Sequence, residues 1–209
     1  MQAPIPVVVR DSPLMRQGGF GVYEGVAEPG VLASLLQEAV ALSRKAVECD
    51  VPMSDGEEVR GGRPARRFLA SSGGPVQRRF SALPSVLQFL RSVTSHALQP
   101  TGELGTYSYY ARAGDYLAIH RDIVTCDVAV ITCLSDAPHM ARGGGLCLYP
   151  GRLFEPLSSI RATPARGACV IKLTAGQTIV LYGGLIPHAL QPVDVGQVRI
   201  VSVLCYRVF

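Results

Sequence analysis

Three residues of this chain are suited to holding one metal ion: His120, Asp122 and His188. Two imidazoles and a carboxylate can occupy one triangular face of an octahedron around iron(II), which leaves three positions open for an oxidant and a co-substrate. In an extended chain, residues two apart point to the same side, so His120 and Asp122 can bind one ion while Arg121 points away. His188 has to come from another strand that folds back against the first. The pattern predicts a mononuclear non-haem iron centre.

Residues flanking these three follow a fixed order. Tyr110 precedes His120 at the end of a tyrosine-rich run, and Arg199 follows His188 after eleven residues. Arginine binds a carboxylate through a planar fork of donors. Because Arg199 lies in an apolar run, an unpaired guanidinium would be costly there, and a bound dianion is its natural partner. Arg199 therefore either ends a surface strand or binds an anion.

Before residue 100, the pattern is mainly helical. Residues 7–9 suggest a short edge strand, and apolar spacing predicts helices over 29–47 and 83–98, each with a proline near its start. The segment 49–74 is rich in Gly, Pro, Ser and charge, and we expect a loop there.

After Pro100, short β-rich runs alternate with turn residues. The expected strands cover residues 104–110, 115–119, 125–134, 146–149, 168–173, 178–182 and 198–208. Helices followed by many short strands indicate a mainly β fold with N-terminal helices, an antiparallel jelly roll or barrel supported by two or more helices. We expect a single domain over 1–209, with a helical support region over about 1–100 and the jelly-roll core over about 101–209.

Composition narrows the class of protein. The chain has 209 residues, of which 48% are hydrophobic and 17% charged, as in a globular domain. No apolar run is long enough to span a membrane, and the first six residues lack the pattern of a signal peptide, so we expect a cytoplasmic protein. The six cysteines show no metal-ligand spacing and are interpreted as small buried hydrophobes in a reducing compartment.

Charge is unevenly distributed along the chain. Six arginines lie between Arg60 and Arg79, and residues 59–102 contain no acidic residue. One interpretation is a solvated loop. The other is a lid or rim that attracts an anionic substrate or partner.

The metal motif and its flanking residues resemble the iron(II)- and 2-oxoglutarate-dependent oxygenases, particularly the prolyl 4-hydroxylase-like branch, over residues 107–207. This resemblance implies a double-stranded β-helix with His120, Asp122 and His188 as iron(II) ligands. Arg199 would hold the far carboxylate of 2-oxoglutarate, and Tyr110 matches a position whose hydroxyl joins that contact. The implied reaction uses O2 and releases succinate and CO2. A carboxylate at 122 favours hydroxylation or a related oxidation over halogenation.

One position departs from the family pattern. Many relatives have a hydroxyl residue two positions after the arginine, where this chain has Val201. Ser202 should point to the other face of the strand. The second hydrogen bond to the co-substrate then has to come from Tyr110, Tyr107 or Thr125.

Further polar residues are candidates for substrate contacts, each with a structural alternative. Arg142 lies beside three glycines and is either at the cavity mouth or solvated. Arg207 should share a strand face with Arg199 and either enters the cavity or pairs with an acid. Tyr107 either contacts substrate or packs in an aromatic group. His139 is a weaker candidate metal ligand in a loop, and His96 is expected to be structural, near the end of a helix.

The predicted function is hydroxylation of an unactivated C–H bond in a small molecule, such as an amino acid or a specialised metabolite, with an anionic substrate favoured by the arginines. One alternative is hydroxylation of a protein or carrier-bound residue. Another is a non-catalytic jelly roll that senses a ligand or metal. Nucleic-acid demethylation is disfavoured because the residues after Arg199 do not match that branch. The sequence makes no prediction of oligomeric state.

Overall fold

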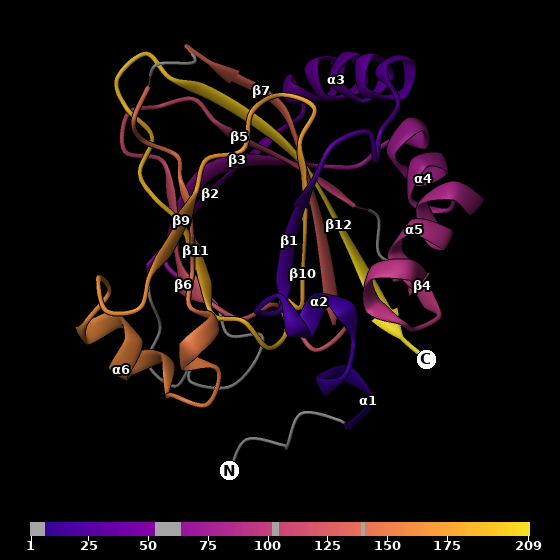
Figure 1. The fold of residues 1–209 in the computed structure, drawn as a ribbon. Helices are drawn as coiled ribbons and strands as arrows, with labels where there is room; N and C mark the ends of the chain where they lie inside the picture. Colours follow the sequence, from indigo (N-terminus) through magenta and orange to yellow (C-terminus); the bar gives the residue numbers. More distant parts are fainter. Residues whose placement is uncertain (1–6, 53–63, 102–104, 139–140) are drawn as a thin grey trace.

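A computed structural model describes residues 7–52, 64–101, 105–138 and 141–209. Its centre is a strongly curled, mostly antiparallel sheet, with helices on the outside (Figure 1). Within the described residues, the hydrogen-bonded strand order is β1-β10-β7-β12-β5-β3-β6-β11-β8-β9, with β2 beside β3 and β4 beside β12. We refer to the part from β1 to β3 as the major sheet and to β6, β11, β8 and β9 as the minor sheet.

The strands of the major sheet and its flanks are β1 (Phe20–Tyr23), β2 (Val47–Val51), β3 (Arg66–Ser72), β4 (Leu98–Pro100), β5 (Thr106–Tyr110), β7 (Val128–Ala137), β10 (Thr178–Leu181) and β12 (Val198–Val208). Those of the minor sheet are β6 (Tyr116–His120), β8 (Leu146–Leu148), β9 (Cys169–Ile171) and β11 (His188–Leu190). The helices are α1 (Val7–Arg10), α2 (Pro13–Arg16), α3 (Pro29–Ser43), α4 (Pro75–Ser81), α5 (Pro84–Thr94) and α6 (Leu157–Ala162), with a short 3-10 turn η1 (Pro150–Arg152).

Strands β7 and β12 pair along most of their length at the centre of the major sheet. Both are rich in valine, isoleucine and other apolar residues, which pack well on a pleated surface. One face of the major sheet packs against the helices in the main hydrophobic core. A second, smaller apolar cluster on the inner face contains Phe68, Tyr110 and Val201.

The Glu38 carboxylate on helix α3 connects the helix to the sheet and to α4, beside a hydrogen bond from the Tyr109 hydroxyl to the carbonyl of Ala39 (2.7 Å). Glu38 accepts hydrogen bonds from the backbone N–H groups of Val76 (2.7 Å) and Gln77 (3.0 Å) at the start of α4. It also accepts one from the Tyr107 hydroxyl on β5 (2.7 Å). A carboxylate with three donors fixes α3, α4 and β5 relative to one another.

The N-terminal half differs from the prediction in several places. Residues 7–10 form a short helix, α1, and not an edge strand. The segment 49–74, expected to be a loop, contains β3 and part of β2, and β3 lies inside the sheet between β5 and β6. Strand β11 was also missed, because a strand of three residues has no readable periodicity. The sheet therefore takes several strands from before residue 101, where only helical support and one edge strand were expected.

Two of the six cysteines are paired. Cys126, just before β7, forms a disulfide with Cys205 on β12. The interpretation of all six as unpaired buried hydrophobes is wrong for these two, since partners 79 residues apart in sequence share no recognisable spacing. The disulfide connects the segment after Asp122 to the major sheet. The predicted compartment stays a prediction.

The helices surround the sheet and are short. Among the described residues, none of them has both the length and the apolar character that a membrane crossing needs.

Candidate metal centre and anion site

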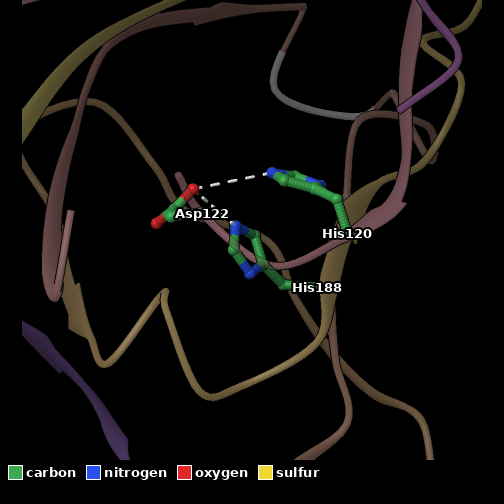
Figure 2. Close-up of side chains that lie close together, drawn as sticks. All are labelled: His120, Asp122 and His188. Atoms are coloured by element: carbon green, nitrogen blue, oxygen red, sulfur yellow. Dashed lines mark ion pairs between the residues drawn. The ribbon is translucent and has the colours of Figure 1, made fainter. Parts of the chain in front are cut away.

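His120, Asp122 and His188 converge on one point, as Figure 2 shows. The Oδ1 atom of Asp122 lies 3.6 Å from Nε2 of His120 and 3.6 Å from Nε2 of His188. The two imidazole rings have centroids 4.2 Å apart. Among the described residues, no other group of three or more His, Cys, Asp or Glu side chains has this spacing.

Strand pairing brings the two histidines together although they are far apart in sequence. His188 begins β11 and lies directly opposite His120, the last residue of β6, in antiparallel register. Asp122 follows two residues later, outside the strand, and its backbone N–H donates to the carbonyl of Gly183 (2.8 Å). The segment before β11 thus positions the carboxylate as well as the second histidine.

An irregularity in β6 aims His120 inward. His188 pairs with His120, and Leu190 pairs with Leu117. The two positions are two residues apart on β11 but three residues apart on β6. The extra residue in β6 is a β-bulge, which changes the alternation of side chains. As a result Leu117 and His120 both line the inner cavity, although their spacing in a regular strand would put them on opposite faces.

Backbone carbonyls orient both imidazoles. Nδ1 of His120 donates to the carbonyl of Ala118 (2.9 Å), and Nδ1 of His188 donates to the carbonyl of Ile186 (2.8 Å). A histidine that donates through Nδ1 keeps the lone pair of Nε2 free for a metal. In both residues it is Nε2 that faces Asp122.

Glycine at position 183 leaves room for the carboxylate. A Cβ atom built on Gly183 would lie 1.7 Å from Oδ2 of Asp122. Any other residue would therefore have to displace Asp122 or the backbone that holds it.

The charges of the three side chains compensate one another. Burial works to raise the pKa of Asp122, but the neighbouring His188 and His120 hold it well below its usual range. Burial works to lower the pKa of His188, and Asp122 reverses that effect and raises it. The pKa of His120 is lowered, by burial first and by His188 second. The surroundings of Asp122 therefore favour its ionised form, which is the form that binds a metal.

These features fit a divalent transition metal. Ligand atoms bound at about 2.1 Å and at right angles lie about 3 Å apart. The 3.6 Å separations in the structure need only a small contraction to reach that geometry. Three protein ligands on one side leave the opposite side, which faces the cavity, open to other ligands.

The metal centre lies in a largely enclosed cavity of about 180 Å³ between the two sheets. Most of its lining is apolar, including Phe68, Leu117, Ile131, Leu190, Val201 and Val203. Arg199 on β12 also lines it, together with Ser108 and Tyr110 on β5.

Arg199 is an almost fully buried cation, with 1% of its surface exposed. Its Nη1 atom donates to the carbonyl of Leu173 (3.1 Å) and lies 3.2 Å from Oδ2 of Asp136, a carboxylate with 4% exposure. Its Nε atom is buried with no hydrogen-bond partner among the described residues. A guanidinium with an unused donor in an apolar cavity is suited to binding an anion.

Asp136 belongs to a wider polar network. It accepts from Nε2 of Gln197 (2.7 Å) and lies 3.4 Å from Nζ of Lys172. Lys172 in turn donates to backbone carbonyls of the segment that follows residue 140, at Ala141 (2.6 Å). One carboxylate between two cations leaves a net positive charge at this end of the cavity.

Comparison of the chain with protein-family models gives no match, and comparison with curated proteins gives none either. Solved structures do match. The α-ketoglutarate-dependent non-haem epimerase SnoN from nogalamycin biosynthesis superposes with a TM-score of 0.71 at 16% identity, over 95% of this chain and 80% of that one. EctD from S. alaskensis, solved with 2-oxoglutarate and 5-hydroxyectoine, gives 0.68 at 17% identity, over 100% and 83%. A prolyl-4-hydroxylase from Pseudomonas putida gives 0.63 at 13% identity, over 97% and 100%.

The chain has the fold of the iron(II)- and 2-oxoglutarate-dependent oxygenases. The predicted double-stranded β-helix is thereby confirmed.

Within this fold, Tyr110 lies next to Arg199. It pairs with Arg199 in the register of β5 and β12 and lines the cavity. Burial raises the pKa of Tyr110, while the neighbouring Arg199 and Ser108 act in the opposite direction. Its hydroxyl therefore stays protonated and can donate.

The three predicted substrate contacts lie outside this cavity. Tyr107 points to the opposite face of β5, where it donates to Glu38. Arg142 is exposed, and its backbone N–H donates to Asp194 (2.7 Å). Arg207 is exposed as well. It lies eight residues further along β12, about 26 Å from Arg199 in an extended strand. Their proposed contacts receive no support from these positions.

The other candidate residues from the sequence also lie away from the site or outside the described residues. Thr125 does not line the cavity, and His96 is buried elsewhere, after α5. His139 lies outside the described residues. Arg121 does point away from the metal ligands, and it is buried there, donating to backbone carbonyls of Leu185 (3.1 Å) and Leu153 (2.7 Å).

Sequence reasoning missed three residues of the site: Ser108, Asp136 and Gly183. Ser108 lies in the alternating run around Tyr110, so the sequence could predict that the two side chains point the same way. It could not predict that Ser108 lies opposite Val201 on β12. Asp136 could be found only from the pairing of β7 with β12. Gly183 is one of two adjacent glycines before His188, a turn signal whose contact with Asp122 has no sequence signature.

Proposed function

We propose that this protein is an iron(II)- and 2-oxoglutarate-dependent oxygenase that hydroxylates a small molecule. One observation carries the proposal. Three metal-binding side chains and a buried arginine with an unused donor line the same cavity of about 180 Å³. A metal-binding 2-oxo acid with a second carboxylate is the class of molecule that could use both groups together.

His120, Asp122 and His188 would hold iron(II), and Arg199 with Tyr110 would bind the far carboxylate of 2-oxoglutarate. When bound, iron and 2-oxoglutarate supply the oxidising chemistry with O2, and succinate and CO2 leave as products alongside the oxidised substrate. The protein's own contribution is position and environment. Arg199 fixes the direction of the diacid, and the apolar lining excludes water from the reacting end.

The volume of the cavity limits what it can contain. Pockets for drug-sized ligands are about 300–1,000 Å³, so this one has room for a five-carbon diacid and little more. The substrate would then bind at the mouth, with only the reacting carbon close to the metal. SnoN and EctD are solved with small molecules, nogalamycin RO and 5-hydroxyectoine, while a prolyl hydroxylase of similar fold from Trichoplax adhaerens is solved with a peptide. The small volume of the cavity is what favours a small molecule in this chain.

Arg66 supports an anionic substrate. It lies two residues before Phe68 on the same face of β3, next to Leu117 in register, and both of these residues line the cavity. Its Nε atom is buried with no hydrogen-bond partner among the described residues. A cation next to these two lining residues would attract an anionic group of the substrate.

Substrate-dependent succinate formation tests the proposal. Purified protein with ferrous iron, 2-oxoglutarate and O2 is screened against amino acids and metabolites, acidic ones first, with His188→Ala as the control. We expect one compound to raise succinate release and to gain the mass of one oxygen atom. Succinate release with a product of unchanged mass would contradict hydroxylation and point to epimerisation, the activity of SnoN.

A non-catalytic sensor is the second candidate, and the same assay separates it. A sensor would bind iron and 2-oxoglutarate without forming succinate in the presence of O2 and any substrate. The open coordination side of the metal ligands favours the enzyme, because a pure binding site gains nothing from leaving it open.

A further inference from the structure

The inner face of β12 offers one anion-binding side chain and no hydroxyl beside it. Val201, two residues after Arg199, points into the cavity. Ser202 points to the other face, where its hydroxyl accepts from Nε2 of Gln77 (2.8 Å). Arg199 is therefore the polar residue that β12 contributes to the cavity.

A carboxylate needs more donors than one guanidinium edge supplies. Its two oxygens together accept about four hydrogen bonds, of which a bidentate arginine satisfies two. In an apolar cavity, each acceptor left without a donor costs free energy. Since Nη1 of Arg199 is already bonded to Leu173 and next to Asp136, the remaining donors have to come from another strand.

Strand β5 carries hydroxyl groups at the required positions. In its register with β12, Tyr110 lies opposite Arg199 and Ser108 lies opposite Val201. Directly opposed residues of antiparallel strands have Cβ atoms about 5 Å apart. Ser108 thus places a hydroxyl one strand away from the position where β12 has an apolar side chain.

The hydroxyl groups on the inner face form a cluster with Arg199. Ser108 is 5% exposed and Tyr110 is 4% exposed, and both line the cavity. Ser108 and Tyr110 lie two residues apart on β5 and therefore point to the same side, toward the cavity that Arg199 also lines. The adjacent tyrosine on the outer face, Tyr109, makes a similar hydroxyl pair with Ser71 (3.0 Å) but faces the helices.

We propose that Ser108, together with Tyr110, donates to the far carboxylate of 2-oxoglutarate and thereby replaces the hydroxyl that β12 lacks at position 201. The inference rests on the proposed function, since it concerns the same co-substrate. Ser108 is then a residue that determines selectivity for a diacid, because only a molecule with a second carboxylate reaches it.

Moving the hydroxyl from one strand to the other tests this assignment. The variants are Ser108→Ala, Val201→Ser and the double variant with both changes. Ser71→Ala is the matched control, because it removes a buried hydroxyl that pairs with a tyrosine on the outer face. Dissociation constants for 2-oxoglutarate are measured without O2 on ferrous protein, through the visible band of the complex, and by thermal shift on metal-free protein.

Loss of one hydrogen bond to a charged group should weaken 2-oxoglutarate binding of Ser108→Ala by about tenfold. The double variant should recover to within about threefold of the wild type, and Ser71→Ala should stay within about twofold. Iron affinity should be unchanged in all of them. With 2-oxopentanoate, which lacks the far carboxylate, wild type and Ser108→Ala should bind equally weakly.

Unchanged 2-oxoglutarate binding in Ser108→Ala would overturn the assignment. So would a weakened Ser108→Ala that Val201→Ser does not rescue, because the loss would then come from packing against Tyr110. If the wild type itself does not bind 2-oxoglutarate, the proposed function fails, and that result is distinguishable from either of the other two.

Discussion

At the metal end of the cavity, three side chains converge from a strand end, the segment behind it and a short partner strand of the minor sheet. At the anion end, the groups project from paired strands of the major sheet, with Arg199, Tyr110 and Asp136 close to the ends of β12, β5 and β7. The metal end depends on irregular backbone: a β-bulge in β6 and a glycine that leaves room for Asp122. The anion end depends on the register in which β12 pairs with β5 and β7, including a shift between Ile200 and Val201.

This difference indicates how each end should respond to change. No other side chain can replace a lost metal ligand, so loss of one should abolish function. Small backbone changes near the ligands should also weaken metal binding. At the anion end, several residues contribute to binding the diacid: Arg199, Tyr110, Ser108 and Asp136. A single change there should therefore weaken diacid binding by an amount that depends on the residue.

The largest effect is expected for His188→Ala. Loss of a partner that only orients a ligand costs about 10- to 100-fold in metal affinity, so loss of the ligand itself should cost about 1,000-fold or more. Ferrous iron binding is measured by anaerobic equilibrium dialysis, with circular dichroism to show that the variant is folded. Iron binding of wild-type strength by the folded variant would show that the ligand assignment is wrong.

A smaller and more selective effect is expected for Arg199→Gln. Removing a buried charge from an ionic contact costs several kcal/mol, which corresponds to roughly 100-fold weaker 2-oxoglutarate binding. Iron affinity should stay as in the wild type, because Arg199 is not among the residues that surround the metal. Anaerobic titration of the ferrous protein gives both constants, and equal losses of iron and diacid would contradict the separation of the two ends.

Asp136→Asn should reduce the stability of the fold more than it reduces iron binding. The change leaves Arg199 without its buried counter-ion, although an amide at 136 can keep hydrogen bonds to its neighbours. We expect a loss of about 2 kcal/mol in the free energy of unfolding, below the roughly 3–5 kcal/mol typical of a fully broken buried pair. Urea denaturation with and without 2-oxoglutarate measures it. A stability equal to that of the wild type would show that Asp136 does not balance the charge of Arg199.

The smallest of these effects is expected for Gly183→Ala. The new Cβ atom would collide with Oδ2 of Asp122 and displace the carboxylate, so iron affinity should fall by about tenfold. Gly151→Ala is the matched control, because a Cβ atom there meets no atom within 4 Å. If both variants bind iron as the wild type does, the metal end does not depend on the space beside Asp122.

The two ends also differ in how far the sequence could predict them. Chemistry restricts metal ligands to a few residue types, and the spacing of His120, Asp122 and His188 makes them recognisable in the sequence alone. Arg199 and Tyr110 were found through the same family pattern. Ser108 and Asp136 belong to the site only because their strands pair with β12 in a particular register, and one sequence does not state which strands pair.

The fold shows a similar division. Helices α3 and α5 and most strands after residue 100 were predicted within a few residues, since their periodicity or β-rich composition is strong. Strand β3 was expected to be loop because it begins with two arginines and contains small polar residues, yet it is held between β5 and β6 by tertiary pairing. The disulfide between Cys126 and Cys205 likewise depends on a contact that spacing does not encode.

The most direct test of the account is a stepwise anaerobic titration of the wild-type protein. Iron(II) should bind first, in one equivalent, and 2-oxoglutarate should then produce a visible charge-transfer band that Arg199→Gln weakens and His188→Ala removes. A wild-type protein that forms no such band, or a band that His188→Ala retains, would contradict the claim that one cavity holds both the metal and the diacid.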